Sequence, residues 1–253
     1  MKKEERKNRF LRIMNEADNN PDIISGIYNY CDRWCERCKF IKRCRVGLME
    51  LESLNDDDTD GSGIWDELSA IFETSFEMII QKADELGIDL NGAPEIEIRK
   101  RKNSHLEKIA SNYAHNVYKW LSDNKTIFDE MVIKAVETEL AVPDYKDALD
   151  IIVWYESLIL VKIKTAKSTL LKVDEFDETY EYLKEHSNGL AKISLIAIDR
   201  SIEAFTLLFY HFPQFEDIIL GFLKQLSEIK KSLLVEFPDA PDFIRPGFDE
   251  IKT

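Results

Sequence analysis

Glycine and proline are scarce in this chain of 253 residues, which contains nine glycines and seven prolines. So few turn-forming residues disfavour an all-β protein, whose many short strands need frequent turns. Leucine, isoleucine, glutamate and lysine are abundant instead, as in proteins built from long helices. With 44% hydrophobic residues, the chain has enough apolar side chains to bury a core. The composition therefore predicts an all-α protein.

Long hydrophobic runs are also missing. No stretch reaches the roughly 18 consecutive apolar residues that a membrane span requires, and the N-terminal sequence MKKEERKNRFLRIMNEADNN lacks the apolar region of a secretory signal. These absences predict a cytoplasmic protein without a membrane partner. Because cytoplasmic thiols are kept reduced, its cysteines are expected to be metal ligands before they are expected to form disulfides.

Positive charge is limited over most of the chain, whose net charge is −14. We expect no general affinity for nucleic acid, because a negative surface repels phosphate. Residues 31–45 are the exception: six basic and two acidic side chains give this segment a charge of +4 and leave −18 for the rest. We interpret this basic segment as the surface for a protein partner.

All four cysteines of the chain lie within fourteen residues, CDRWCERCKFIKRC, at spacings of three, two and five residues. They are Cys31, Cys35, Cys38 and Cys44. Four clustered thiols in a reducing compartment predict a single metal centre, a knuckle to which all four contribute. The neighbouring cations support this prediction, since they favour the thiolate form that binds metal. Thiols without a metal, including redox-active ones, are the alternative.

The identity of the metal depends on the local backbone. If the segment is helical, Cys31, Cys35 and Cys38 share one face but span about 10.5 Å along the axis. Tetrahedral zinc needs its sulfurs within roughly 4 Å of one another, so zinc would require the helix to break near Cys35. An iron–sulfur cluster such as 4Fe–4S is larger and usually has four cysteine ligands. This reasoning favours an iron–sulfur cluster, with structural zinc as the second choice.

The run NDDDTDGSG and the residues after it match the calcium loop of an EF-hand. Carboxylates at alternate positions, a glycine for the sharp turn and a final glutamate are all present. The four carboxylates belong to Asp56, Asp58, Asp60 and Glu67. However, Gly63 stands where an apolar residue is usual, and the sequence has no second loop to pair with. We interpret the run as a solvated linker, with a single calcium site as the alternative.

The acidic linker, residues 55–63, separates an N-terminal helical segment with the metal site, residues 1–54, from a helical bundle with an extended C-terminal tail, residues 64–253. Apolar residues at helical spacing predict about six helices in the bundle. Their ranges are 64–86, 106–121, 128–140, 145–171, 190–212 and 215–237. The sequence HSNG at 186–189 is expected to be the break before the fifth of them.

No familiar catalytic motif occurs in the sequence. The four histidines form no pair at helical spacing, and Glu-x-x-His and phosphate-binding glycine loops are absent. In helix 145–171, Glu156 and Lys162 lie off the polar stripe by roughly 120° on opposite sides. Their side chains are expected to reach water along the flanks. If both instead converged in a cavity, a redox enzyme fed by the metal centre would become the alternative function.

The helix predicted at 190–212 carries a polar face. Lys192, Asp199 and Glu203 share this face, and Arg200 lies at its margin. We interpret the sequence AIDRSI as an exposed stripe rather than a site.

Four stretches of the chain resemble a family of bacterial proteins with no assigned activity. They are YCDRWCERCKFIKRC, the WY of helix 145–171, AKISLIAIDRSIEAF at 191–205, and FPDAPDFIRPGFD near the C-terminus. Since these stretches span nearly the whole length, the resemblance implies one evolutionary unit, and it implies no functional residues. The triplet Cys35, Cys38 and Cys44 is also similar to the distal cysteines of iron–sulfur RecB-like nucleases, but their nuclease motif is absent here. The predicted function is a metal-binding protein that acts as a binding or redox-sensing module.

Overall fold

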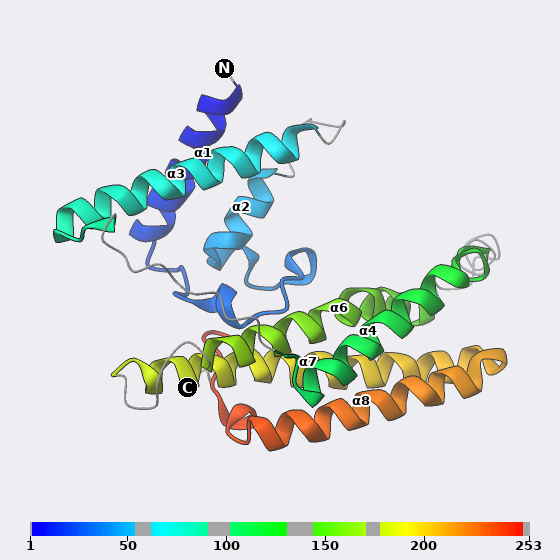
Figure 1. The fold of residues 1–253 in the computed structure, drawn as a ribbon. Helices are drawn as coiled ribbons and strands as arrows, with labels where there is room; N and C mark the ends of the chain where they lie inside the picture. Colours follow the sequence, from blue (N-terminus) through cyan, green and yellow to red (C-terminus); the bar gives the residue numbers. More distant parts are fainter. Residues whose placement is uncertain (1, 54–61, 91–101, 131–143, 171–177, 250–253) are drawn as a thin grey trace. The chain divides into compact units, whose positions relative to one another are not determined.

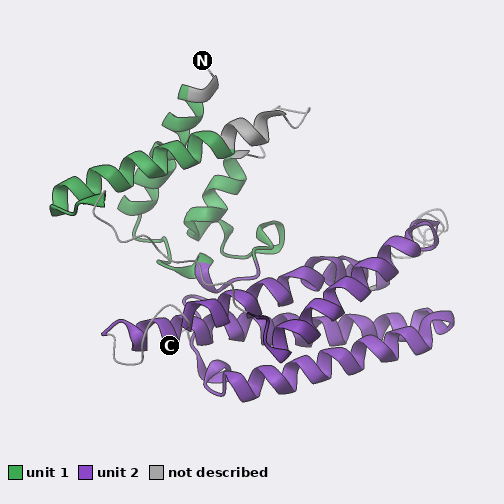
Figure 2. Cartoon of the chain, viewed as in Figure 1, with its two compact units in different colours: residues 1–28, 33–101 green, residues 29–32, 102–253 purple. Residues whose placement is uncertain are grey.

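The computed structural model describes residues 2–53, 62–90, 102–130, 144–170 and 178–249 (Figure 1). Over these ranges the chain forms helices and connecting loops without a β-strand, which confirms the all-α prediction. None of the helices found there is long and apolar enough to cross a membrane. The chain divides into two compact units, coloured separately in Figure 2. Unit 1 comprises residues 1–28 and 33–101, and unit 2 comprises residues 29–32 and 102–253.

In the described part of unit 1, three α-helices form a small cluster. They are α1 (Lys2–Asn19), α2 (Arg45–Ser53) and α3 (Ser62–Leu86). α1 packs against both of the others. Its buried face carries Phe10, Ile13 and Ala17, which recur at helical spacing and account for the amphipathic character of the helix.

Helix α3 confirms the helix predicted at 64–86 but buries a different face. The expected apolar stripe is largely exposed: Phe72 is 71% exposed and Phe76 is 62% exposed. Ala83 of that stripe is buried as expected, but the other buried residues are Ala70 and Thr74, which lie on a different face. Small side chains allow closer approach of two helices than large ones do, so the helix packs through its small residues. The sequence pattern identified the helix but not the face that it buries.

In the described part of unit 2, four long helices form a bundle (Figure 1). They are α4 (His105–Asp123), α6 (Asp144–Leu170), α7 (Tyr180–His211) and α8 (Glu216–Glu236). α6 and α8 each pack against both α4 and α7, so every helix has two neighbours around a shared core. Three of these helices begin and end within two residues of their predicted bounds. The helix predicted at 128–140 lies mostly outside the described residues.

Helix α4 begins at a capping box that the apolar spacing alone did not reveal. The Glu107 backbone N–H donates to Ser104 Oγ at 3.3 Å, and the Ser104 N–H donates to Glu107 Oε2 at 2.8 Å. These bonds satisfy two of the backbone groups at the helix start. They also explain why the Glu107 side chain is buried although it is charged.

The break predicted at HSNG is wrong, because α7 begins at Tyr180 and runs through residues 186–189 without interruption. Ser187 and Gly189 both serve packing inside the helix. Ser187 Oγ donates to Ala166 O of α6 at 2.6 Å. Gly189 is buried, and a Cβ at this position would lie 2.3 Å from Tyr30 Cε1 and 2.8 Å from Phe243 Cζ. The glycine therefore makes room for two aromatic rings rather than ending the helix.

Candidate functional site

The four cysteines lie in a segment without an α-helix. Its regular parts are two short 3-10 helices, η2 (Cys35–Arg37) and η3 (Ile41–Arg43). The Cys38 N–H donates to Cys35 O at 3.0 Å, which closes a tight turn between these two residues. The segment is therefore not the α-helix in which Cys31, Cys35 and Cys38 would share one face. The preference for an iron–sulfur cluster over zinc assumed such a helix, so that argument no longer applies.

The cysteines differ in their surroundings. Cys35, Cys38 and Cys44 belong to unit 1, whereas Cys31 belongs to the 29–32 segment of unit 2. Cys44 is buried and the other three are partly exposed, and no disulfide joins any of the four. Across the described residues, no group of three or more His, Cys, Asp or Glu side chains is placed to hold a metal ion. The four-cysteine centre therefore stays a prediction.

The backbone around Cys44 is held firmly within unit 1. The Ile24 N–H donates to Arg43 O at 2.9 Å, and the Leu48 N–H donates to Cys44 O at 2.9 Å. α2 also approaches η3 closely, since a Cβ on Gly47 would lie 2.3 Å from Ile41 O. The turn that precedes Cys44 is thus a packed element of unit 1.

Basic side chains lie on the surface of the cysteine segment. Arg45 forms an ion pair with Asp18, and the Arg37 guanidinium lies 3.9 Å from the centre of the Trp34 ring. The exposed basic residues are Arg33, Arg37, Lys39, Lys42 and Arg43. Exposed cations of this density attract acidic groups, especially at low ionic strength.

Asp32 is one of the residues that attach the 29–32 segment to the bundle of unit 2. Tyr155 Oη donates to Asp32 Oδ2 at 2.6 Å, and Arg200 Nη1 donates to the same oxygen at 2.8 Å. Trp154 Nε1 donates to the Asp32 backbone oxygen at 2.9 Å. Burial, and then the neighbouring Asp32 carboxylate, raise the pKa of Tyr155. Arg200, predicted at the margin of an exposed stripe, remains half exposed but links α7 to Asp32.

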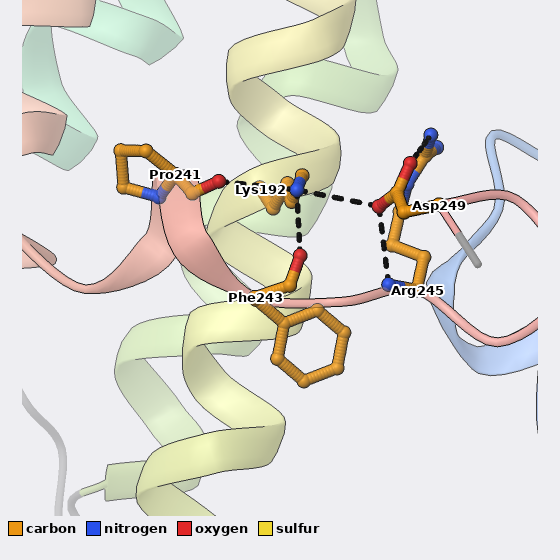
Figure 3. A network of polar contacts seen from close by, with 5 residues as sticks. All are labelled: Lys192, Pro241, Phe243, Arg245 and Asp249. Carbon is orange, nitrogen blue, oxygen red and sulfur yellow. Dashed lines mark hydrogen bonds and ion pairs between the residues drawn. The ribbon is translucent and has the colours of Figure 1, made fainter. Parts of the chain in front are cut away.

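A second network holds the C-terminal segment against α7 (Figure 3). Lys192 Nζ donates to Phe243 O at 2.6 Å and to Pro241 O at 3.1 Å, and it lies 3.3 Å from Asp249 Oδ2. The Asp249 carboxylate also accepts from Arg245 Nε at 2.9 Å and from Nη2 at 2.8 Å. The Lys192 side chain is only 17% exposed, so its assignment to a solvated stripe is wrong.

We expect Lys192→Met to loosen the C-terminal segment, because three oxygen acceptors lose their donor. The expected loss is about 1–2 kcal/mol of unfolding free energy at pH 7, measured by urea denaturation. Limited proteolysis should also cut the segment after residue 240 faster. The exposed substitution Lys224→Met on α8 is the matched control and should change stability by less than about 0.5 kcal/mol. Equal cleavage of both variants would contradict the assigned anchor.

The same network predicts that the stability contributed by Lys192 depends on pH. Hydrogen bonds from Arg245, assisted by Lys192, hold the pKa of Asp249 well below its ordinary value of 3.8. A carboxyl group whose pKa is lowered by folding stabilises the folded state. This contribution is complete at a pH above the ordinary pKa of the group, and it is lost as the pH falls through the pKa of the folded state. The stability difference between the wild-type protein and Lys192→Met should therefore shrink as the pH falls below 3.8.

A groove of about 770 Å³ lies in unit 2 between α4 and α6. Its wall contains apolar and aromatic side chains together with five charged ones. The charged residues are Lys125, Asp129, Lys146, Asp150 and Glu156. Lys146 Nζ pairs with Asp150 Oδ2 at 3.1 Å. Glu156 Oε2 is buried and has no hydrogen-bond partner among the described residues.

Three buried side-chain oxygen atoms of unit 2 have no hydrogen-bond partner in the part of the chain that the structure describes. They belong to Glu156 on α6, Tyr113 on α4 and Ser201 on α7. Burial raises the pKa of Tyr113, Ser201 lowers it and Glu156 raises it further, so both side chains lie near its hydroxyl group. Burial likewise raises the pKa of Glu156. The expectation that Glu156 simply reaches water is therefore wrong for its Oε2 atom.

Lys162 does not join Glu156 in the groove. The groove lining as described includes Glu156 but not Lys162. Burial, and then the charge of Lys162, lower the pKa of His186, which places this lysine near α7 instead. The convergence that would have favoured a redox enzyme is therefore not observed.

The calcium hypothesis concerns residues beyond the described ranges. Asp56, Asp58 and Asp60 lie outside them, and the side chain of Glu67 at the start of α3 is likewise not described. This hypothesis stays a prediction.

Comparisons with protein-family models, with curated sequences and with solved structures found no match to this chain. What defines the class of the protein is its own fold: over the described residues, the chain is all-α, with four long helices in unit 2 and three α-helices in unit 1. The family resemblance of the cysteine motif and the C-terminal stretch stays a prediction.

Proposed function

We propose that the chain is a metal-binding protein in which Cys31, Cys35, Cys38 and Cys44 bind one metal centre. The observation that carries this proposal is the concentration of every thiol of the chain in a segment built from tight turns. Short turns, unlike a straight helix, allow successive cysteines to approach a common point. Cys31 and Cys35 are separated by three residues, which keeps their Cα atoms within about 14 Å whatever the local conformation.

The donor set fits both an iron–sulfur cluster and zinc. Four thiolates are the usual ligands of a cluster and also complete a tetrahedral structural zinc site. The side chains are not gathered in the structure, and metal binding commonly orders its own ligands. In either case the centre would supply a crosslink that holds the turns of the segment together.

The function of the centre is proposed to be the display of a basic binding surface. Five exposed cations surround the cysteines in a protein that is strongly acidic elsewhere. Ordering of the turns by a metal would fix the spacing of these cations. The partner is expected to be a protein with an acidic surface, because charge complementarity selects such partners.

The proposal is tested by purifying the full chain without oxygen and measuring iron, zinc, calcium and sulfide per chain. A cluster predicts about four irons with matching sulfide and absorbance near roughly 400 nm. Structural zinc predicts about one colourless zinc ion per chain. Cys35→Ser and Cys38→Ser are each expected to reduce metal content by at least about tenfold, since both remove a thiolate ligand.

Glu36→Ser is the matched control, because Glu36 lies in the same turn, is exposed and has no thiol. This variant should keep its full metal content. Full metal content in Cys35→Ser would overturn the four-ligand site. The absence of stoichiometric iron and zinc from the anaerobically purified wild-type protein would overturn the proposed function.

A further inference from the structure

We propose that the groove between α4 and α6 binds a primary organic amine. The ammonium group would pair with Glu156, and the apolar body would lie against Leu121, Leu149 and Val153. This inference is independent of the cysteines and of the metal centre. It rests on a cavity, an unsatisfied carboxylate and the distribution of charge around them.

The first step is the unsatisfied state of Glu156. A buried carboxylate oxygen without a hydrogen bond raises the free energy of the folded state, because it has lost its water partners and gained none in the protein. Tyr113 and Ser201 are fully buried, but each hydroxyl group can both donate and accept, so neither selects a ligand by itself. The Glu156 Oε2 atom differs from them, because an ionised carboxylate oxygen only accepts. An ammonium group carries three N–H donors and no acceptor, so it supplies the donor that this oxygen lacks.

The second step is the sign of the charge. Three carboxylates and two lysines line the groove. One lysine, Lys146, is already paired with Asp150 at 3.1 Å, whereas burial alone shifts the pKa of Glu156 and no cation lowers it. Glu156 is partly exposed and only its Oε2 atom is buried, so a ligand cation would pair with this oxygen and a ligand anion would be repelled by it. The groove therefore selects a cation.

The third step is the apolar wall. The volume of about 770 Å³ lies within the range of small-molecule sites. Leu149 and Phe128 are buried at the groove, while Val153 and Tyr118 are exposed along it. A flat or branched hydrocarbon of moderate size would bury these side chains further. The expected ligand is therefore an amine with an aromatic or aliphatic body rather than a polyamine or a metal ion.

The experiment titrates the full chain with three probes that share a phenyl body: 2-phenylethylamine, 2-phenylethanol and phenylacetate. Isothermal titration calorimetry at neutral pH should show saturable binding of about one amine per chain. The amine is expected to bind at least about tenfold more tightly than the alcohol, because its hydrogen bond is charge-assisted. Phenylacetate is expected not to bind.

Two variants locate the site. Glu156→Gln should weaken amine binding by about tenfold or more while leaving the alcohol unaffected. Val153→Trp should block the amine by filling the groove, although Glu156 is unchanged and the substituted position is exposed. Glu228→Gln, an exposed position on α8, is the matched control and should bind the amine as the wild-type protein does.

Several outcomes would overturn the inference. Equal affinity for amine and alcohol would remove the role of the ammonium group. Tighter binding of phenylacetate would reverse the sign of the charge preference. Unchanged amine binding in Val153→Trp would show that any bound amine lies outside the groove, even if Glu156→Gln fails to fold.

Discussion

Replacing Gly189 by alanine is expected to destabilise unit 2 by roughly 2–3 kcal/mol, the upper part of the range for overpacking a core. The added Cβ would lie 2.3 Å from Tyr30 Cε1, 2.5 Å from Tyr30 Cδ1 and 2.8 Å from Phe243 Cζ. Neither ring can move easily, since their centroids lie 4.6 Å apart and Tyr30 Oη is hydrogen-bonded to His186 Nδ1 at 2.9 Å. The measurement is the free energy of unfolding in urea, followed by circular dichroism.

The expected loss of stability in Gly189→Ala is opposite in sign to the effect of helix propensity alone. Glycine to alanine inside a helix normally stabilises a protein by up to about 1 kcal/mol. Gly221 on α8 provides the matched control, because a Cβ there would meet no atom within 4 Å. Gly221→Ala should therefore stabilise the chain, and Tyr30→Ala should reduce the cost of Gly189→Ala. Stabilisation by both glycine substitutions would contradict the packing of the two rings on α7.

Asp32→Ala is expected to lower the stability of unit 2 by roughly 2–4 kcal/mol. The substitution removes the carboxylate that accepts hydrogen bonds from Tyr155 at 2.6 Å and from Arg200 at 2.8 Å. Hydrogen bonds to a charged group typically contribute about 1.5–3 kcal/mol each, and the partial exposure of Arg200 reduces its share. The Tyr155 residue is fully buried, so its hydroxyl group cannot turn to bulk water as compensation. Urea denaturation measures the loss.

A double-mutant cycle measures the coupling between the two side chains. Tyr155→Phe removes the donor to Asp32 and the oxygen that accepts from Arg200 Nη1, and it should cost about 1–2 kcal/mol by itself. Combined with Asp32→Ala it should cost less than the sum of the single effects, with a coupling of about 1 kcal/mol. Glu203→Ala is the control, because this carboxylate is exposed on the same helix as Arg200. Strict additivity of Asp32→Ala and Tyr155→Phe would argue against a direct bond.

The positions of the helices were largely predictable because the apolar period is a local property. α4, α6 and α8 begin and end close to the expected residues, and the spacing of Leu106, Tyr113 and Val117 is enough to specify a buried stripe. Local signals failed where a neighbour determined their meaning. HSNG has the composition of a helix end, yet its glycine is required by the rings of Tyr30 and Phe243.

The sequence also did not predict which face of α3 is buried. Phe72 and Phe76 are the more hydrophobic candidates on α3, but Ala70 and Thr74, on another face, are buried. Hydrophobicity measures the gain from burial, whereas the packing distance between two helices depends on the size of the side chains at their contact. That distance is not encoded in the periodicity of either helix.

The sequence by itself determined the helical class of the protein and the four cysteines as metal-ligand candidates, because both depend on residues that are close along the chain. Only the tertiary structure decided that the cysteine segment forms turns, that Asp32 meets an arginine 168 residues away, and that Lys192 holds the C-terminal segment. It also decided that Glu156 lines a groove and that its Oε2 atom has no hydrogen-bond partner among the described residues. Such contacts join residues distant in sequence, and their energy depends on burial and distance, which arise only when the helices pack.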